Sequence, residues 1–472
     1  MPSARLAIAS LSLSMLLSSL GTSIASVALP TLSDAFNVPF QQVQWVVIAY
    51  LVVITSFIVS VGRLGDIVGR RRLLLAGLAA FTTASALCAV ATSLQALVVF
   101  RGIQGLGASV MMALTMALVT EAAPEERTGS AMGLLATTSA VGTALGPSLG
   151  GMLIAGWGWP AVFLINVPVG ILAFGLASLY LPPDTKAGTS AARFDGLGTV
   201  LLASSMAAFA LSMTLGRGHF GLLNGALVVG AAGGMVVFLF SQTRVASPLI
   251  RLASFQDKGF SAGLAANSLV STVMMATLVI GPFYLTGALG LREVEVGLVM
   301  SIGPIVSACA GVPAGHLVDR YGASRMVPAG LMTMLAGAAA IAELSSPYGL
   351  VGYVAGILLL TPGYQLFQAA NNTAVLATVA PGERGVRSGM LNLSRNLGLV
   401  TGASAMGAIF AITVGTSPAG PGDPNAVTSG MQMTFAVAAA LMTVAVALAM
   451  FGRIVVQKTA ANNVYKASSP DH

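Results

Sequence analysis

Long apolar runs separated by short polar segments extend along the whole sequence. Fourteen of these runs are about 20 residues long, the length that lets an α-helix cross the ~30 Å hydrocarbon core of a bilayer. We therefore predict an all-α polytopic membrane protein with 14 transmembrane helices. The predicted spans are residues 6–30, 43–61, 73–91, 95–119, 130–155, 160–181, 196–215, 221–241, 260–286, 294–314, 327–344, 350–379, 386–412 and 431–452.

Two polar motifs between the runs occur twice. The string GRLGDIVGRRR at Gly62–Arg72 is similar to GHLVDRYGASR at Gly315–Arg325, 253 residues later. The string at Ala123–Arg127 is similar to the one at Ala380–Arg384, 257 residues later. Nearly equal offsets indicate a duplicated half, and duplicated halves in a membrane chain are typical of transporters that move one half relative to the other.

The duplication predicts the domain organisation, because six spans per half leave two spans without a counterpart. We expect a six-helix bundle at residues 6–181, a linker with an inserted two-helix hairpin at 182–259, a second six-helix bundle at 260–455, and a cytoplasmic tail at 456–472. The two bundles form a pseudo-two-fold repeat. Met1–Ala28 also has features of a secretory signal, but its apolar stretch runs on to Pro30 and matches a helix of the second half, so we interpret residues 6–30 as the first span.

Composition and charge agree with a membrane protein. Only 8% of the residues are charged, against roughly 25% in soluble domains, and the mean hydropathy is +0.88. Of the 22 lysines and arginines, 18 lie on one side of the predicted spans, Arg217 and Arg292 lie on the other, and Arg101 and Arg395 lie within spans. The basic side is expected to be cytoplasmic, so both termini are predicted inside, and the net charge of +7 does not indicate a nucleic-acid partner.

Several function classes lack their motifs. No phosphate-binding glycine-rich loop with its lysine occurs, so ATP-driven pumping is not expected. The three histidines do not form a metal-ligand cluster with Cys88 and Cys309, which lie inside apolar runs. We therefore expect no cofactor, no metal and no enzymatic activity.

The first repeated motif offers a candidate latch. Gly62, Gly65 and Gly69 permit a tight reversal and close helix contact. Asp66 can pair with a cation or with a helix N-terminus, and such a pair between cytoplasmic ends would stabilise one transport state. Arg63, Arg70 and Arg71 are the nearby cations. The second copy keeps Asp319 and Arg320 but is degenerate, and the alternative is that the motif acts only as a topology signal.

Two further motifs lie within spans. Arg101 stands in the string RGIQGLG of the fourth span. An arginine inside a membrane costs several kcal/mol of free energy unless it is paired or hydrated, so we interpret it first as a functional residue. The alternative is a structural arginine bonded to carbonyls.

The fifth span contains the string GTALGPSLGG. Its small residues let helices approach closely, and its proline bends the helix. The alternative is that the string serves packing alone. The fifth-span residues are Gly142, Gly146, Pro147, Gly150 and Gly151.

These motifs resemble those of the major facilitator superfamily, in its 14-helix branch of drug:proton antiporter-like proteins, over residues 6–455. The resemblance implies a secondary transporter that works by alternating access. It implies that the residue matching Asp66 latches the outward-open form, that the residue matching Arg101 serves proton coupling or substrate contact, and that the fifth-span string is characteristic of antiporters.

One departure from the family bears on the substrate. The family has an aspartate in the first span where this chain has Gly21, and none of the 15 acidic residues lies clearly at mid-membrane; Asp34 and Glu343 come nearest. The charges inside spans, Arg101 and Arg395, are both positive, which predicts a neutral or anionic substrate. The candidate substrate or coupling residues are Arg101, Gln104, Tyr50, Asn267, Gln365, Gln368, Asn371, Asn372 and Arg395.

Among the predicted spans, the twelfth carries the most candidate polar side chains, and most of them are amides. Gln365, Gln368 and Asn372 share one helical face, and amides offer paired donors and acceptors suited to a heterocycle or a polyol. The alternative is hydrogen bonding between helices.

We therefore predict a secondary active transporter that moves a small neutral or anionic organic molecule across the inner membrane, with efflux favoured. The alternative is uptake of a nutrient or vitamin such as riboflavin. A non-transporting receptor is a remote alternative, because no signalling domain is attached. The expected partners are the small-molecule substrate and the lipid bilayer, a coupling proton is left open, and the chain is expected to be a monomer.

The asymmetry of basic residues predicts a labelling pattern. Single cysteines at Ser33 and Gly422 should react with a membrane-impermeant thiol reagent added to whole cells, whereas cysteines at Ser190 and Ala460 should not. Labelling of position 190 from outside would contradict the 14-helix topology.

Overall fold

The computed structural model describes most of the chain, and all the secondary structure of the described residues is helical. The repeated motif at residues 123–127 and most of its copy at 380–384 lie outside the described residues, as do positions 190, 217 and 422. The described residues are 2–122, 128–184, 195–215, 221–245, 248–250, 252–377, 384–416 and 423–468.

The first half of the chain folds around its N-terminal helix. This helix, α1, packs against α6, α7 and α9, so the segment with features of a signal sequence is part of the bundle. The helices of this half are α1 (Pro2–Val27), α2 (Leu29–Phe36), α3 (Phe40–Val43), α4 (Trp45–Val68), α5 (Arg70–Ala89), α6 (Leu94–Ala122), α7 (Thr128–Trp157), α8 (Ala161–Leu164) and α9 (Asn166–Tyr180).

The second half repeats this plan around α12, which packs against α14, α15 and α17. A left-handed turn at Gly349 (φ 52°) divides α14 into two helices, and a π-helical turn at Gly402–Met406 joins α15 to α16. The remaining helices are α10 (Gly196–Thr214) and α11 (Leu222–Gln242) of the inserted hairpin, then α12 (Lys258–Gly287), α13 (Glu293–Tyr321), α14 (Ala323–Ala377), α15 (Arg384–Thr401), α16 (Gly407–Gly415) and α17 (Pro424–Ser468).

Helix length and hydropathy support a multi-pass membrane protein. Among the described residues, 12 helices are long and apolar enough to cross a bilayer. One of the 12, Ala323–Val375, contains the Gly349 turn and covers the eleventh and twelfth predicted spans. A further helix, α7, has 30 residues and covers the fifth predicted span. The helices follow the predicted spans, and the total of 14 stays a prediction.

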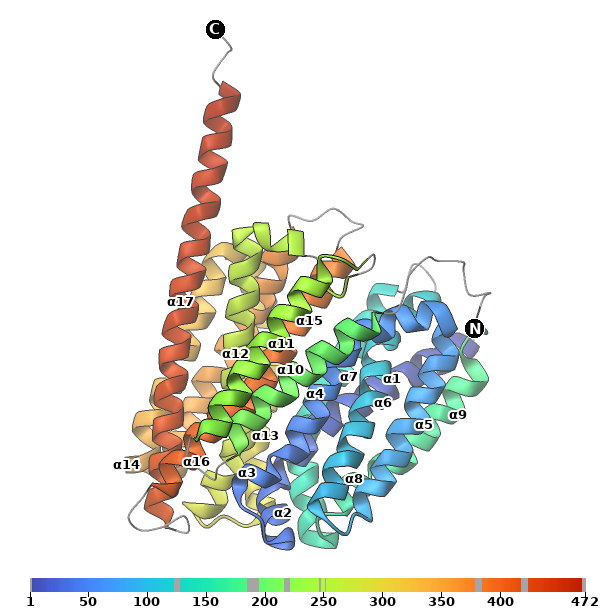
Figure 1. The fold of residues 1–472 in the computed structure, drawn as a ribbon, viewed down its shortest axis with the longest axis vertical. Coiled ribbons are helices and arrows are strands. Elements are labelled where there is room, and N and C mark those ends of the chain that lie inside the picture. The colour runs from blue at the N-terminus through green and yellow to red at the C-terminus, as the bar shows by residue number, and fades with distance from the viewer. Residues whose placement is uncertain are drawn as a thin grey trace.

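The two halves lie side by side (Figure 1). The short helices α2 and α3 lie at one side of the molecule, which we call the α2 side, and both termini lie toward the opposite side, the N/C side (Figure 1). The ribbons of the two halves diverge toward the N/C side. The basic residues predict that the N/C side is cytoplasmic.

The inserted hairpin is attached to the first half. The indole Nε1 of Trp45 on α4 donates to Thr214 Oγ1 of α10 at 2.9 Å, and Ser60 Oγ lies 2.5 Å from Thr199 Oγ1 near the other end of the same helix pair. Helix α10 also contacts α15, the π-helical turn and α16, but within the described part of the chain no side-chain hydrogen bond joins it to the second half. The hairpin therefore covers a seam between the halves while being fixed to α4.

Candidate transport site

The repeated motif folds differently from the expected loop. Residues Gly62–Asp66 lie inside α4, which continues to Val68, and only Gly69 reverses the chain, with φ +107°. The close packing of this helix requires glycine at position 65, because a Cβ atom there would lie 2.6 Å from the Leu114 side chain of α6. The second copy has the same geometry: α13 runs through Asp319 and Arg320, and the chain reverses at Gly322 (φ +82°). Gly69 therefore makes the expected reversal and Gly65 the expected close helix contact, whereas a Cβ atom on Gly62 would meet nothing within 4 Å.

Asp66 pairs within its own half. Its Oδ1 accepts hydrogen bonds from Nε and Nη2 of Arg70 at 3.0 and 2.8 Å. Both side chains are more than a third exposed, so the pair contributes about 0–1 kcal/mol. In this conformation the pair joins α4 to α5 rather than one half to the other, and the latch stays a prediction. Asp319 and Arg320 of the second copy are both exposed.

Asp184 is the acidic residue of this region that the sequence did not single out. It follows α9, and its carboxylate accepts from the backbone N–H groups of Arg71 and Arg72 at 2.8 and 3.2 Å, which caps the N-terminus of α5. The Arg71 guanidinium donates to the carbonyl of Ser178 in α9, and Arg63 donates to the carbonyl of Pro248 between α11 and α12. The arginines of the motif thus fix neighbouring segments.

Arg101 lies at the centre of the first half with no exposed surface. Its guanidinium donates to the carbonyl oxygens of Val46 (2.8 Å) and Gly21 (3.2 Å) and to Oε1 of Gln104 (2.5 Å). It also stands 4.2 Å from the ring centroid of Tyr50, a cation–π distance. The arginine therefore joins α1, α4 and α6, and its side chain is fully buried among them in this conformation.

The other polar residues of this region complete the same network. Gln104 Nε2 donates to Ser85 Oγ of α5 at 2.7 Å, and the Tyr50 hydroxyl donates to the carbonyl of Ser18 in α1 at 3.0 Å. Both side chains are fully buried. Gly21, at the position where the resemblance implies an aspartate, contributes its backbone carbonyl to Arg101, and a Cβ atom there would lie 3.1 Å from the Tyr50 hydroxyl.

The fifth-span string has two contact faces. Gly142, Gly146 and Gly150 all face α1; a Cβ atom on Gly142 would lie 2.9 Å from the Leu16 carbonyl oxygen, and one on Gly146 would overlap the Ser23 side chain. These three glycines, spaced by four residues, let α7 lie directly against α1 within the first half.

The second face of the string meets the other half of the protein. A Cβ atom on Gly151 would lie 2.5 Å from the Glu293 carbonyl oxygen and 3.0 Å from Gly297 Cα, and a Cβ atom on Gly297 would lie 2.6 Å from the Pro147 carbonyl oxygen. Only glycine allows α7 and α13 to approach this closely. The contact holds the two halves together toward the α2 side.

The amide residues of α14 differ in their surroundings. Tyr364, Gln365 and Gln368 are half-buried, and Gln368 Nε2 donates to the Tyr364 hydroxyl at 3.1 Å. Gln365 Nε2 donates to Ser307 Oγ of α13. The predicted face of the helix is present, and both glutamines keep a carbonyl oxygen that these bonds do not use. Asn372, one turn on, is exposed.

The remaining candidates divide into buried and exposed residues. Asn267 of α12 is buried and donates to the Leu391 carbonyl (2.9 Å) and to Ser394 Oγ (3.1 Å) of α15. Asn371 is buried and donates to the Gly263 carbonyl at 3.4 Å. Both amides therefore connect helices of the second half, whereas Arg395 of α15 is exposed.

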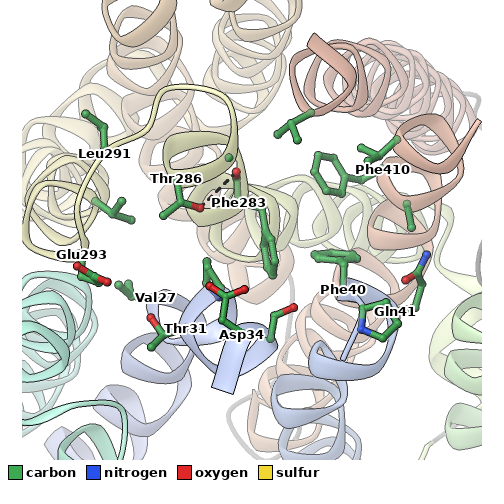
Figure 2. Close-up of a pocket in the computed structure, with 18 of the residues that line it drawn as sticks. Val27, Thr31, Asp34, Phe40, Gln41, Phe283, Thr286, Leu291, Glu293 and Phe410 are labelled. Carbon is green, nitrogen blue, oxygen red and sulfur yellow. Dashed lines mark hydrogen bonds between the residues drawn. The ribbon is translucent and has the colours of Figure 1, made fainter. Parts of the chain in front are cut away.

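A cavity of about 800 Å³ lies on the α2 side between the two halves (Figure 2). Three phenylalanines form its aromatic wall: Phe40 of α3 lies 4.7 Å from Phe283 of α12 and 5.2 Å from Phe410 of α16, measured between ring centroids. We call these three rings the aromatic clamp. Asp34 of α2 and Glu293 of α13 also line the cavity. The sequence did not single out this site, because its residues come from seven helices spread over both halves.

The aromatic clamp and the α7–α13 contact both join the two halves at the α2 side. The described acidic residues within helices lie in terminal turns, or, for exposed Glu343, less than two turns from the break at Gly349. No group of His, Cys, Asp and Glu side chains in the described ranges is arranged to hold a metal ion. The arrangement is that of two helical bundles around polar residues, without a catalytic constellation.

Comparison with known proteins identifies the family. The sequence profile of the Major Facilitator Superfamily matches residues 11–283 and 264–468. The chain belongs to the major facilitator superfamily. It is 30% identical to riboflavin transporter RibZ of Clostridioides difficile over 84% of this chain and 86% of RibZ. It is 31% identical to multidrug resistance protein Stp of Mycobacterium tuberculosis over 82% of this chain and 72% of Stp.

Solved structures of the superfamily share the fold. An inward-facing, unoccupied bacterial homologue of the human lysosomal transporter Spinster superposes with a TM-score of 0.74 at 14% identity, covering 97% of this chain and 98% of that chain. The predictions of a major facilitator of the drug-efflux-like branch, of a secondary transporter and of a protein that is not an enzyme are confirmed. This major facilitator is a multi-pass protein of the inner membrane with a small-molecule substrate.

Replacing Arg101 tests its position between three helices. Arg101→Ala removes three hydrogen bonds to buried acceptors and should lower the free energy of unfolding by about 3 kcal/mol. Arg101→Lys should restore part of the loss, because an ammonium group cannot copy the guanidinium fork. Thermal unfolding of the purified protein measures both. Arg395→Ala, at an exposed arginine within a span, is the matched control and should leave the unfolding temperature unchanged; equal effects of the two alanine variants would contradict a joining role for Arg101.

Proposed function

We propose that this major facilitator exports small neutral or anionic organic molecules, with flat heterocycles as the preferred class. The observation that carries the proposal is the distribution of charge and amides. In the described spans, every acidic residue lies close to a helix end or to the break at Gly349, and none lies in the middle of a helix. Gln365 and Gln368, by contrast, are half-buried on one face of α14.

The missing carboxylate argues against cations as the main substrates. A cation that moves between the halves needs a counter-charge, because desolvating an unpaired charge costs several kcal/mol. The first half offers a fully bonded guanidinium, Arg101, and a glycine at position 21. The second half adds the exposed cation Arg395. A neutral molecule meets no such penalty, and Arg395 offers an anion the counter-charge that a cation lacks.

The amides of α14 supply recognition of a heterocycle. Each glutamine has two donors and a carbonyl acceptor, and the hydrogen bonds to Ser307 and Tyr364 use only their donors. The free acceptors can pair with ring N–H groups of a substrate. Neighbouring Tyr364 adds an aromatic surface on which a flat ring can stack.

Efflux is supported by the fifth-span string and by the name of one relative. The string occurs in full here, and the resemblance links it to antiporters; the multidrug resistance protein Stp is 31% identical. The competing direction, uptake of a vitamin, is favoured by the 30% identity to riboflavin transporter RibZ and by the same amides. A coupling proton is left open.

The transport cycle follows from the contacts between the halves. Residues 6–181 and 260–455 are the two moving bundles, and the inserted hairpin at 182–259 moves with the first, to which Trp45 and Ser60 fix it. With the aromatic clamp closed at the α2 side, this conformation faces the cytoplasm, where both termini lie. The working unit is the monomer.

A substrate screen tests the proposed charge preference. Expression in an efflux-deficient bacterium should raise resistance to neutral or anionic aromatic compounds and give little resistance to quaternary ammonium compounds. Gln365→Leu with Gln368→Leu should weaken the gained resistance about 30-fold, because the two lost hydrogen bonds are together worth roughly 2 kcal/mol. Thr373→Val on the same helix, whose hydroxyl bonds only its own backbone, is the control.

The direction of transport is tested by expressing the same variants in a riboflavin auxotroph. Growth of a riboflavin auxotroph on low riboflavin, restored by the wild type and lost in the double glutamine variant, would favour uptake and contradict export. Strong resistance to quaternary ammonium compounds would contradict the proposed substrate class.

Two cysteine pairs test which contacts must open during transport. In a background with exposed Cys309 replaced by serine, oxidation of Ser60→Cys with Thr199→Cys should form a disulfide, since the side-chain oxygens are 2.5 Å apart, and transport should persist. A short bifunctional thiol reagent across Phe40→Cys and Phe410→Cys should abolish transport, because it joins the halves at the clamp.

Reduction of the disulfide, or the uncross-linked form of the clamp pair, is the control in each case. Transport that stops when α10 is joined to α4 would show that the hairpin moves relative to the first half. Transport that survives the clamp cross-link would contradict alternating access through the α2 side.

A further inference from the structure

The cavity on the α2 side has the size and walls of a ligand site. Its volume of about 800 Å³ falls within the roughly 300–1,000 Å³ of small-molecule pockets. The rings of Phe283 and Phe410 flank Phe40 on two sides (Figure 2). Thr31 and Gln41 add polar atoms to the lining. A flat apolar molecule can therefore lie against the rings with polar groups at its edge.

The charge of the lining has one sign. Asp34 and Glu293 line the cavity from opposite halves, and no lining residue is basic. Arg292, next to Glu293 in the chain, pairs with Glu295 at 2.7 Å instead, and no ion pair to Asp34 or Glu293 occurs among the residues that the structure describes. Figure 2 shows both carboxylates with the aromatic clamp around the same space.

Aromatic faces and unpaired carboxylates together favour a cation. The partly exposed rings of Phe40 and Phe283 can attract an organic cation, and the two carboxylates supply the counter-charge that the described spans lack. We infer that the α2-side cavity is a binding site for aromatic organic cations, separate from the site of transport.

The location of the site gives it a consequence for transport. Both halves contribute lining residues, so the cavity in this form exists only while the halves meet at the α2 side. A ligand that fills it binds this conformation better than one in which the halves have separated there, and it shifts the population accordingly. Aromatic cations should therefore act at this site as inhibitors that hold the α2 side closed.

Ethidium binding to the purified wild-type protein tests the site without requiring transport. Fluorescence anisotropy should give saturable binding that weakens when salt is raised from low to about 0.3 M, since the carboxylates are exposed and screened. The uncharged ring system of the same shape, 6-phenylphenanthridine, should compete at least tenfold more weakly. Equal competition by the neutral compound would overturn the inference.

Charge-neutral variants locate the binding. Asp34→Asn and Glu293→Gln should each weaken ethidium binding about fivefold, and the double variant about 20-fold or more. Glu343→Gln, which removes an exposed carboxylate that does not line the cavity, is the matched control and should bind ethidium as the wild type does. Undiminished binding by the double variant, or an equal loss in the control, would show that ethidium binds elsewhere.

The outcome is independent of the proposed export function. Saturable binding that depends on Asp34 and Glu293 supports the site whether the protein exports or imports its substrate. A failed substrate screen with intact ethidium binding would count against the proposed function alone.

Discussion

The fold of the first half depends on one buried cation. In the core of a bilayer no water is available for hydrogen bonding, so each polar group needs a hydrogen-bond partner within the protein. A guanidinium needs the most partners, because it is charged and has five N–H donors. Arg101 takes its partners from three helices: the Gly21 carbonyl on α1, the Val46 carbonyl on α4 and the Gln104 amide on α6. These helices must keep their relative positions for the charge to remain satisfied, and α1 in turn determines where α7 packs.

Glycine extends this constraint to the boundary between the halves. One face of α7 lies against α1 through Gly142, Gly146 and Gly150, and the adjacent face, about 100° around the helix, meets Gly297 of α13 through Pro147 and Gly151. The helix that packs on the arginine-bonded core is thus the helix that contacts the second half. A change at either face reaches the other through a single rigid element. This connection gives a physical route between the central network and closure at the α2 side.

Charge divides the protein into two chemically different regions. The centre of the first half holds a cation compensated by carbonyl dipoles, and α14 presents amides. The α2-side cavity holds two carboxylates and an aromatic clamp. The proposed transport of neutral or anionic molecules and the inferred binding of aromatic cations follow from this separation. Each region can be altered by substitutions that leave the other intact.

The sequence by itself determined the helices, the duplication and the family. The position of each span depends on the length of one apolar run, which neighbouring residues define. The chain reversals at Gly69 and Gly322 are 253 residues apart, the same distance as the two copies of the motif, so they too could be found from the sequence. The string Gly62–Asp66 was predicted to lie between spans but continues helix α4, where Gly65 packs against Leu114 of α6, a contact that no local pattern encodes.

Only the tertiary structure decided the partners of the polar groups. Arg101 was visible as a charge inside a span, but its acceptors stand 55 and 80 residues away. Asp184 caps a helix more than 110 residues earlier in the chain, and Phe40 meets its aromatic partners in the other half. Hydrophobic periodicity acts over a few residues, whereas the satisfaction of a buried polar atom and the shape of a cavity between bundles depend on which distant helices come to lie side by side.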